Sequence, residues 1–338
     1  MLRDFNPEPH SLDGASLLVT GGTGSFGRQF VRHVLEHHKP RRLAIFSRDE
    51  LKQYEMAQEL SEEDHPCLRY FIGDVRDRDR LELAMRDIDY VIHAAALKQV
   101  PAAEYNPFEC IKTNVHGAEN VARAAMETGV KRVLALSTDK AANPVNLYGA
   151  SKLASDKIFV AANNMTGAGG TRFSVVRYGN VVNSRGSVVP LFRRLRDEGV
   201  TELPITDDRM TRFWITLDQG VAFVLSSLER MIGGEIFVPK IPSMRIVDLA
   251  TALVPGATTR IVGIRPGEKL HEVMVPREDG RLTLEFEDRY VIEPAFQFWS
   301  REDFQERWGG TPVDHEFHFS SDTNTEWLTA EQIQDIAG

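Results

Sequence analysis

The sequence predicts an α/β fold in which a doubly wound parallel sheet is joined to a smaller, irregular lobe. From Ser16 to Val176, short β-branched runs alternate with longer helical segments, which is the pattern of such a sheet. A glycine-rich turn follows the first run. After Arg177 the alternation ends, and turns that contain glycine or proline become frequent. We therefore expect one sheet domain followed by one lobe.

Six runs are predicted to be strands of the sheet, and right-handed crossovers through the intervening helices would place them in the Rossmann order. The predicted boundary leaves a Rossmann domain over residues 1–177 and mainly the lobe over residues 178–338. One later segment, Leu217–Met231, is expected to return and pack on the first domain. The predicted strands are Ser16–Thr20, Arg42–Phe46, Leu68–Ile72, Asp89–His93, Arg132–Leu136 and Phe173–Val176.

Composition excludes several classes of protein. With 49 acidic against 40 basic residues the net charge is -9, so there is no bulk attraction to nucleic acid or to an anionic membrane. The two cysteines, Cys67 and Cys110, lack the spacing of a disulfide framework or a metal site, which fits a reducing compartment. No signal peptide or membrane span is evident in the first sixteen residues, so a cytoplasmic location is expected. His315 and His318 are expected to lie in a solvated turn, without a metal.

The glycine-rich turn predicts a dinucleotide site. Gly21, Gly24 and Gly27 have GxxGxxG spacing between the first strand and an apolar helix. Glycines let the backbone approach a pyrophosphate, and the helix N-terminus stabilises its charge. A turn without a ligand is the bland alternative, but the position at the first strand-to-helix turn favours the site. The predicted contacts in this loop are Gly21, Thr23, Gly24, Ser25, Phe26 and Gly27.

The end of the second strand bears on the choice of cofactor. Arg48 and Lys52 could bind a ribose 2′-phosphate, so NADP is favoured, while Asp49 leaves NAD open. Residues 1–177 would then form an NADP-binding domain. The other predicted contacts, at the ends of strands two, three and four, are Ser47, Asp74, Val75 and Ala94.

Tyr148 and Lys152 are four residues apart at the start of a helical segment, so both side chains point to one face. A free tyrosine has a pKa of about 10, but an adjacent ammonium and the positive nicotinamide would favour its phenolate. Tyr148 is therefore predicted to be the base for a substrate hydroxyl, with Thr138 as its hydrogen-bond partner. Together with the glycine loop, these residues indicate a short-chain dehydrogenase.

Asp139 and Lys140 precede this segment. Adjacent Asp and Lys usually form a surface ion pair, which is the alternative interpretation. In this fold the position faces the substrate beside the nicotinamide, where an acid and a base allow elimination as well as hydride transfer. Lys140 would need a lowered pKa, which positive neighbours would supply, and Asp139 would need to be protonated when it acts.

With these motifs the chain closely resembles the inverting UDP-N-acetylglucosamine 4,6-dehydratases, extended short-chain dehydrogenases of the polysaccharide biosynthesis family that begin pseudaminic acid and related bacterial glycan pathways. The resemblance covers roughly residues 15 to 285. It includes "TGGTGSFG", "SRDELKQYEM", "HAAALKQVPAAEYNP", "ALSTDKAANPVNLYGASK", "RFSVVRYGNV", "PITDDRMTRFWI" and "GIRPGEKLHE".

The resemblance implies roles for individual residues. Lys140 removes the C5 proton, Asp139 handles the C6 hydroxyl, and Tyr148 with Lys152 manages the C4 hydroxyl. It also implies that the cofactor, NADP, is a catalyst without net oxidation, that the substrate is UDP-N-acetylglucosamine, and that the protein is a homo-oligomer, a hexamer being one candidate. Residues at family positions that hold the sugar nucleotide or line the site are Lys98, Asn180, Arg185 and Arg265.

Other residues leave choices open. Arg209 and Arg212 would reach the diphosphate or form structural carboxylate pairs, and Glu268 could orient Arg265. Gln99 and Asn183 replace the family's His and Gly, without removing a catalytic group. Relatives that retain the C5 configuration carry Met at the position of Tyr148, and dTDP-glucose dehydratases carry Asp-Glu at 139–140, so both comparisons favour the inverting type. A C5-retaining dehydratase, a UDP-sugar 4-epimerase and a non-catalytic dinucleotide sensor are the alternatives.

Overall fold

The computed structural model describes residues 3–5, 11–167, 169–182, 188–297 and 303–337. The first six strands of the chain lie side by side in the order third, second, first, fourth, fifth, sixth, and every neighbouring pair is parallel. The predicted doubly wound sheet in the Rossmann order is thus confirmed. These strands are β1 (Ser16–Thr20), β2 (Arg42–Ser47), β3 (Leu68–Ile72), β4 (Tyr90–His93), β5 (Arg132–Thr138) and β6 (Arg172–Tyr178).

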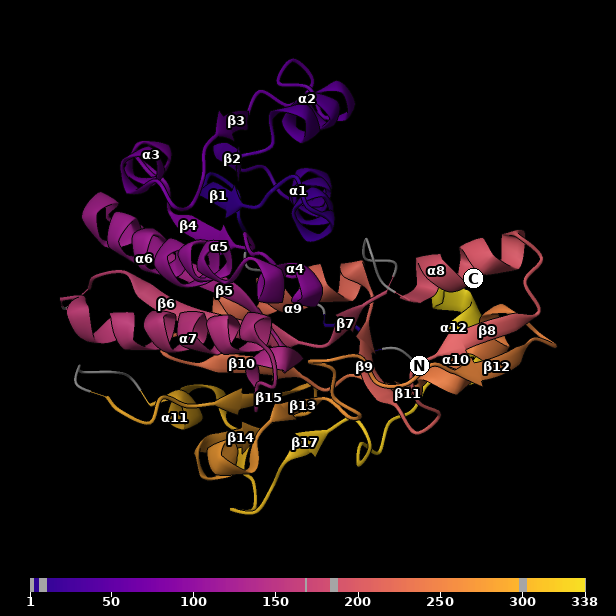
Figure 1. Cartoon of the computed structure of the whole chain (residues 1–338). Helices are drawn as coiled ribbons and strands as arrows, with labels where there is room; N and C mark the ends of the chain where they lie inside the picture. Colours follow the sequence, from indigo (N-terminus) through magenta and orange to yellow (C-terminus); the bar gives the residue numbers. More distant parts are fainter. Residues whose placement is uncertain (1–2, 6–10, 168, 183–187, 298–302, 338) are drawn as a thin grey trace.

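The apolar runs form strands because both faces of the sheet are covered. All five residues of β1 are buried, as expected for a central strand of a parallel sheet. Figure 1 shows α1 and α9 on one side of the sheet and α3, α6 and α7 on the other. The helices of this part are α1 (Ser25–His37), α2 (Glu50–Glu59), α3 (Arg78–Ala84), α4 (Val100–Tyr105), α5 (Pro107–Ile111), α6 (Gly117–Thr128), α7 (Leu147–Ala162) and α9 (Leu217–Arg230).

β5 extends two residues beyond its predicted end. Ser137 and Thr138 pair with Arg177 and Tyr178 of β6, so the strand continues to the edge where polar side chains begin. A short 3-10 turn, Asp139–Ala141, follows at once. The longer strand carries the Ser-Thr-Asp-Lys segment to the carboxyl edge of the sheet, which is where ligands bind in such folds.

The second half of the chain returns to the sheet. The helix α9 packs on α1, and its N-terminus has a capping box formed by Thr216 and Gln219. The strand β10 (Ile236–Pro239) is parallel to β6. The sheet then continues through β15 (Arg289–Ile292), β14 (Thr283–Glu285) and β16 (Thr311–Pro312), each antiparallel to its neighbour. One hydrophobic cluster joins buried residues from Phe5 to Phe319.

A second hydrophobic cluster forms the lobe beside the sheet. The lobe lies to the right in Figure 1. Its elements are β7 (Asn180–Val181), α8 (Val188–Asp197), β8 (Glu202–Ile205), β9 (Thr211–Ile215), β11 (Ser243–Arg245), α10 (Ile246–Leu253), β12 (Thr258–Ile261) and α12 (Ala330–Ala337). The remaining elements are β13 (Val273–Val275), α11 (Phe304–Trp308) and β17 (Phe319–Ser320). Within the described ranges, no helix is long and apolar enough to cross a bilayer.

Candidate active site

A cavity of about 1420 Å³ lies between the carboxyl edge of the sheet and the lobe. It brings together the residues predicted for the cofactor, the chemistry and the substrate, with two exceptions. Asp139 is fully buried beside the cavity. Arg185 lies outside the described residues, as does Asn183. The predicted residues that line the cavity are Gly21, Thr23, Gly24, Ser25, Phe26, Gly27, Ser47, Arg48, Lys52, Asp74, Val75, Ala94, Lys98, Thr138, Lys140, Tyr148, Lys152, Asn180 and Arg265.

The glycine loop has the shape that a pyrophosphate requires. Gly21 has a φ of +66°, and a Cβ there would lie 2.8 Å from the backbone nitrogen of Ala95. A Cβ on Gly27 would lie 2.5 Å from the Cα of Gly22. Among the described residues no side chain caps the N-terminus of α1, and its first turn has no acidic residue. The free N–H groups of this helix end therefore fit an anionic group in the cavity.

Arg48 and Lys52 differ in how they are held. The Asp49 side chain caps α2 by accepting from the backbone N–H of Lys52 at 3.0 Å, and it also pairs with the Lys52 ammonium. Arg48 Nη1 lies 3.6 Å from Asp74 Oδ2, and the Arg48 side chain is 54% exposed. Lys52 is thus already neutralised by a neighbour, whereas Arg48 remains open to solvent for a phosphate.

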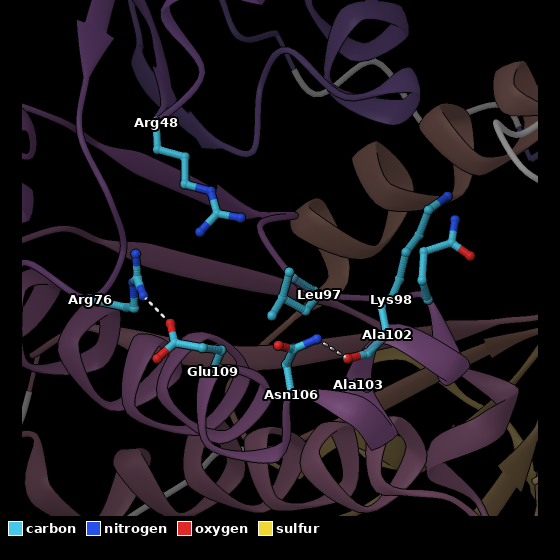
Figure 2. Close-up of a pocket in the computed structure, with 10 residues that line it drawn as sticks. Arg48, Arg76, Leu97, Lys98, Ala102, Ala103, Asn106 and Glu109 are labelled. Carbon is cyan, nitrogen blue, oxygen red and sulfur yellow. Dashed lines mark hydrogen bonds and ion pairs between the residues drawn. The ribbon is translucent and has the colours of Figure 1, made fainter.

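A smaller pocket of about 430 Å³ adjoins this end of the cavity. Figure 2 shows the guanidinium groups of Arg48 and Arg76 on one side of it and the Lys98 side chain on the other. Arg76 is engaged by two carboxylates, with its nitrogens 2.8 Å from Asp74 and 2.5 Å from Glu109. Arg48, Lys98 and the backbone between the carboxyl end of β4 and α4 line both spaces, so the pocket is an extension of the dinucleotide end.

Asp139 and Lys140 form an ion pair in the wall of the cavity, in which Asp139 is fully buried and Lys140 is partly exposed to the cavity. Asp139 Oδ1 accepts hydrogen bonds from Thr138 Oγ1 at 2.8 Å and from Lys140 Nζ at 3.0 Å. The Asp139 side chain is fully buried, and in the described part of the chain nothing hydrogen-bonds to its Oδ2. Lys140 Nζ also donates to Asn180 Oδ1 at 3.4 Å. The two residues are positioned by the turn at the end of β5, because Thr138 Oγ1 accepts from the Lys140 backbone at 3.3 Å.

The predicted lowering of the Lys140 pKa is wrong for the ligand-free protein. Burial lowers the pKa of this amine, but the carboxylates of Asp139 and Glu272 more than offset that effect, so the pKa is raised. Glu272 Oε1 lies 3.3 Å from Lys140 Nζ. The positive neighbour, Arg212, opposes the carboxylates without overcoming them. Lys140 is therefore an ammonium in this state.

Tyr148 is held as a neutral phenol. Burial raises the pKa of Tyr148 to about 12, against the opposing effects of the Lys140 charge and a hydrogen bond with the Thr138 hydroxyl. The predicted phenolate is thus not favoured before the cofactor binds. The Lys140 charge is the main cationic influence on the pKa of Tyr148. A hydrogen bond at the start of α7, from the Gly149 N–H to Asn146 Oδ1 at 2.8 Å, fixes the position of Tyr148.

Lys152 belongs to a buried network behind the site. Its Nζ donates to the carbonyl oxygen of Leu136 at 2.8 Å. Burial lowers the pKa of Lys152, and Asp156 opposes this effect. Asp156 Oδ2 in turn accepts from Ser137 Oγ at 2.8 Å and from Arg177 Nη2 at 3.4 Å. The network ties α7 to β5 and β6.

Arg209 and Arg212 have protein partners, and Arg212 also lines the cavity. The guanidinium of Arg209 makes two bonds to Asp207, at 2.9 and 2.8 Å, on the surface. Arg212 is buried, and its Nη1 and Nη2 donate to three backbone carbonyls, those of residues 211, 270 and 269. Arg265 pairs with Glu268 and its side chain is 71% exposed at the rim of the cavity, as expected if Glu268 orients it.

Glu272 is the site residue that the sequence reasoning missed. It contacts Lys140, Arg212 and Lys269, and it lines the cavity. The one signal for it was its place at the end of "GEKLHE", inside a motif of the resemblance. No group of histidine, cysteine and carboxylate side chains in the described ranges could hold a metal ion, His315 and His318 included.

Known proteins share this fold and these motifs. A family described as Polysaccharide biosynthesis protein matches residues 17–294. The inverting UDP-N-acetylglucosamine 4,6-dehydratase of Campylobacter jejuni subsp. jejuni serotype O:2 is 60% identical over 327 residues, covering 95% of this chain and 96% of that protein. Pen from Bacillus thuringiensis has a TM-score of 0.85 at 32% identity and covers 96% and 98% of the two chains. DesIV, a dTDP-glucose 4,6-dehydratase from Streptomyces venezuelae with NAD and TYD bound, has a TM-score of 0.65 at 27% identity, covering 75% and 86%.

Proposed function

The chain belongs to the polysaccharide biosynthesis protein family and, within it, to the inverting UDP-N-acetylglucosamine 4,6-dehydratases, and we propose that this enzyme removes water from UDP-N-acetylglucosamine with inversion at C5. The product is UDP-2-acetamido-2,6-dideoxy-β-L-arabino-hexos-4-ulose. The observation that carries the proposal is the buried Asp139 and Lys140 pair beside Tyr148. An epimerase would use Tyr148 and Lys152 but would have no need of an acid and a base at residues 139 and 140.

The cavity fits a nicotinamide dinucleotide through its glycine loop, and such a cofactor, when bound, accepts the C4 hydride and later supplies it to C6. NAD is bound in the DesIV structure. We propose NADP for this chain, because Arg48 is exposed at the end of β2. Its ion-pair partner among the described residues, Asp74 Oδ2, is 3.6 Å away. A ribose 2′-phosphate would give this guanidinium a further anionic partner.

Tyr148 is proposed to take the proton of the C4 hydroxyl. Its pKa of about 12 in the ligand-free protein means that added positive charge has to lower it first. The positive nicotinamide ring of an oxidised dinucleotide would supply that charge. The Thr138 hydroxyl, which hydrogen-bonds to Tyr148 and lies next to Asp139, keeps the phenol in place.

Lys140 and Asp139 are proposed to carry out the elimination. A ketone at C4 makes the C5 hydrogen acidic, so a neutral amine can remove it while a carboxylic acid protonates the departing C6 hydroxyl. Transfer of one proton from Lys140 Nζ to Asp139 Oδ1, across 3.0 Å, converts the resting ion pair to this active form without any change in net charge. After water leaves, the ion pair is restored. C5 then takes a solvent-derived proton from the face opposite Lys140, and the proton that Tyr148 took from the C4 hydroxyl returns to solvent.

Mass and NMR analysis of the product from UDP-N-acetylglucosamine tests the proposal. In heavy water, C5 should acquire solvent deuterium, because Lys140 keeps the proton that it removes and an exchangeable proton reaches C5 from the opposite face, whereas the hydrogen delivered to C6 should come from C4. The product should have the L-arabino configuration. A D-xylo product at the earliest times would indicate a retaining dehydratase, and a product of unchanged mass would indicate an epimerase.

Arg48→Ala tests the choice of cofactor. We expect the variant to lose most of its preference for NADP over NAD, about tenfold or more, since a charged hydrogen bond contributes about 1.5–3 kcal/mol. Dinucleotide affinities measured by titration give the ratio. Lys52→Ala is the control, and it should lose less because Asp49 already neutralises Lys52. An unchanged ratio in Arg48→Ala would refute the assignment.

The family resemblance also supports a homo-oligomer, a cytoplasmic location and a place at the start of a pseudaminic acid or related surface glycan pathway, and we include these in the proposal. Light scattering on the purified protein would measure the mass of the assembly. A monomer at working concentration would contradict the first of them.

A further inference from the structure

The amine of Lys140 lies between two carboxylates that come from distant parts of the chain. Asp139 is its neighbour in sequence, with Oδ1 at 3.0 Å, and Glu272 precedes β13, with Oε1 at 3.3 Å. Asp139 is fully buried, whereas Lys140 and Glu272 both line the cavity. Glu272 is therefore the carboxylate that contacts the amine on the side where the sugar would bind.

The backbone around Glu272 is held firmly. Its N–H donates to Ser321 Oγ at 2.9 Å, and its carbonyl oxygen accepts from the Ser321 N–H at 2.8 Å and from Ser320 Oγ at 3.3 Å. Its side chain lies 3.8 Å from both Arg212 Nε and Lys269 Nζ. Backbone hydrogen bonds and two cations hold this carboxylate in place, so it does not move with Lys140. It can therefore keep the amine in a fixed position.

One oxygen of Glu272, Oε2, has an ion-pair neighbour but no hydrogen-bond partner among the described residues. In the described part of the chain, Oε2 is buried and accepts no hydrogen bond, as is also true of Asp139 Oδ2. Buried carboxylate oxygens normally have a partner. Each of the two carboxyl groups beside Lys140 therefore has one oxygen that can still accept a hydrogen bond. Such oxygens suit a site where a proton moves from one group to another.

The proposed elimination needs Asp139 to hold a proton and Lys140 to be neutral. When the proton has moved to Asp139, that residue no longer attracts the amine as a charge, and Glu272 Oε1, 3.3 Å from Nζ, is the other carboxyl oxygen beside the amine. A neutral amine still has two N–H groups, and one of them can donate to Glu272 Oε1. Its lone pair then has a fixed direction instead of rotating freely.

We propose that Glu272 is a positioning residue for Lys140: it holds the amine toward C5 of the sugar while Asp139 carries the proton. This inference rests on the proposed dehydration. It assigns Glu272 no contact with the reacting atoms, so the effect of its removal should appear in the C5 step and not in the transfer of the C4 hydride.

Glu272 should also affect the pH dependence. The charged or titratable groups around Lys140 are Asp139, Glu272, Arg212, Lys269 and Tyr148. Removing the negative charge of Glu272 leaves Asp139 to balance the nearby cations. The pair of Lys140 and Asp139 should therefore lose its shared proton at lower pH. An opposite charge at this distance typically shifts a pKa by about 1–3 units.

Glu272→Gln and Glu272→Asp separate charge from position. In Glu272→Gln, we expect deuterium uptake at C5 and water loss to fall about 100-fold, the typical effect of misplacing a reacting group by about 1 Å. The alkaline limb of the rate profile should move to lower pH by about 1–3 units. Glu272→Asp keeps the charge on a shorter side chain, so its rate should fall while its alkaline limb stays near that of the wild type.

Glu235→Gln is the matched control. Glu235 is fully buried, and its side chain accepts from Ser174 Oγ at 2.5 Å and from the Gly233 N–H at 3.0 Å, away from the cavity. Its substitution also removes a buried carboxylate, but it should leave both the alkaline limb and the C5 exchange unchanged. Reduction of bound cofactor, followed at 340 nm on mixing with substrate, should stay within about threefold of the wild type in all three variants.

The outcomes distinguish the inference from the function on which it rests. If the wild type releases no water, the proposed function is wrong and the inference falls with it. If the wild type releases water and Glu272→Gln matches it in rate and in alkaline limb, the positioning role alone is wrong. If Glu272→Gln does not fold, Glu272→Asp decides, because a normal C5 exchange rate in that variant would also overturn the role.

Discussion

At the scale of single residues, the structure shows charge states opposite to those that catalysis needs. Lys140 is an ammonium because two carboxylates outweigh its burial, and Tyr148 is a neutral phenol because burial outweighs its cationic neighbour. Both groups have to lose a proton before they can act as bases.

Lys140→Ala should abolish dehydration. The variant removes the proposed base, so we expect water loss to fall by several orders of magnitude while folding and NADP binding persist. Product mass measures the first effect, and dinucleotide titration measures the second. Lys157→Ala, at an exposed position of α7, is the control and should behave as the wild type. Near-normal turnover in Lys140→Ala would assign the C5 proton to another group.

Tyr148 should make stability fall at alkaline pH. Its folded pKa of about 12 is above the unfolded value of about 10. The stability that the neutral phenol contributes is therefore complete below pH 10 and is lost as the pH rises toward 12. Relative to Tyr148→Phe, the wild type should lose up to about 1.4 kcal/mol per pH unit in this window. Urea unfolding at pH 9, 10 and 11 gives the two slopes, and parallel slopes would contradict the raised pKa.

At the scale of elements, the site is built from short connections at the carboxyl edge of the sheet. The turn Asp139–Ala141 and the cap at Asn146 join β5 to α7, so that Asp139, Lys140 and Tyr148 meet within one supersecondary unit. The same geometry operates at the other end of the cavity, where the glycine loop joins β1 to α1. In both places the end of the strand fixes where the turn begins, and the N-terminus of the helix fixes where the turn ends.

Gly21→Ala should impair this glycine loop more than the stability of the fold. Gly21 and Gly129 have similar positive φ angles, +66° and +73°, but a Cβ on Gly21 would lie 2.8 Å from the Ala95 nitrogen, whereas a Cβ on Gly129 meets no described atom within 4 Å. Each Ala variant should lose about 1–2 kcal/mol through its left-handed backbone.

Gly21→Ala should in addition bind the dinucleotide at least tenfold more weakly, because the loop must shift to admit the methyl group. Thermal denaturation and dinucleotide titration of both variants measure the two effects. Equal affinities in Gly21→Ala and Gly129→Ala would mean that the close approach of Gly21 to Ala95 does not shape the cofactor site.

At the scale of the whole molecule, the two halves of the sequence share one sheet. Residues of β10 pair with β6 through Ile236 and Val175, and β15, β14 and β16 continue the sheet beyond it. Without β10, the buried strand β6 would be an open edge of apolar residues. The cavity also needs both halves, because Lys140 and Glu272 come from either side of this junction.

The shared sheet predicts that the two halves unfold together. The four tryptophans all lie in the second half, so tryptophan fluorescence reports on that half, while far-UV circular dichroism is dominated by the helices of the first half. We expect the two transitions in urea to coincide, as in a cooperative unit. A fluorescence transition at clearly lower urea would show that the second half unfolds separately. The tryptophans are Trp214, Trp299, Trp308 and Trp327.

The sequence alone determined the strand order, the glycine loop and the spacing of the candidate catalytic residues, because these depend on neighbouring residues and on regular geometry. Tertiary structure decided the rest. It placed β10 and its neighbours in the main sheet, paired Arg209 with Asp207, gave Arg212 backbone carbonyls as partners, and brought Glu272 to Lys140. It also raised the pKa of Lys140 and of Tyr148, Lys140 through its carboxylate neighbours and Tyr148 through burial. A charge state depends on burial and on the sum of all nearby charges, and those charges come from segments that lie far apart in the chain.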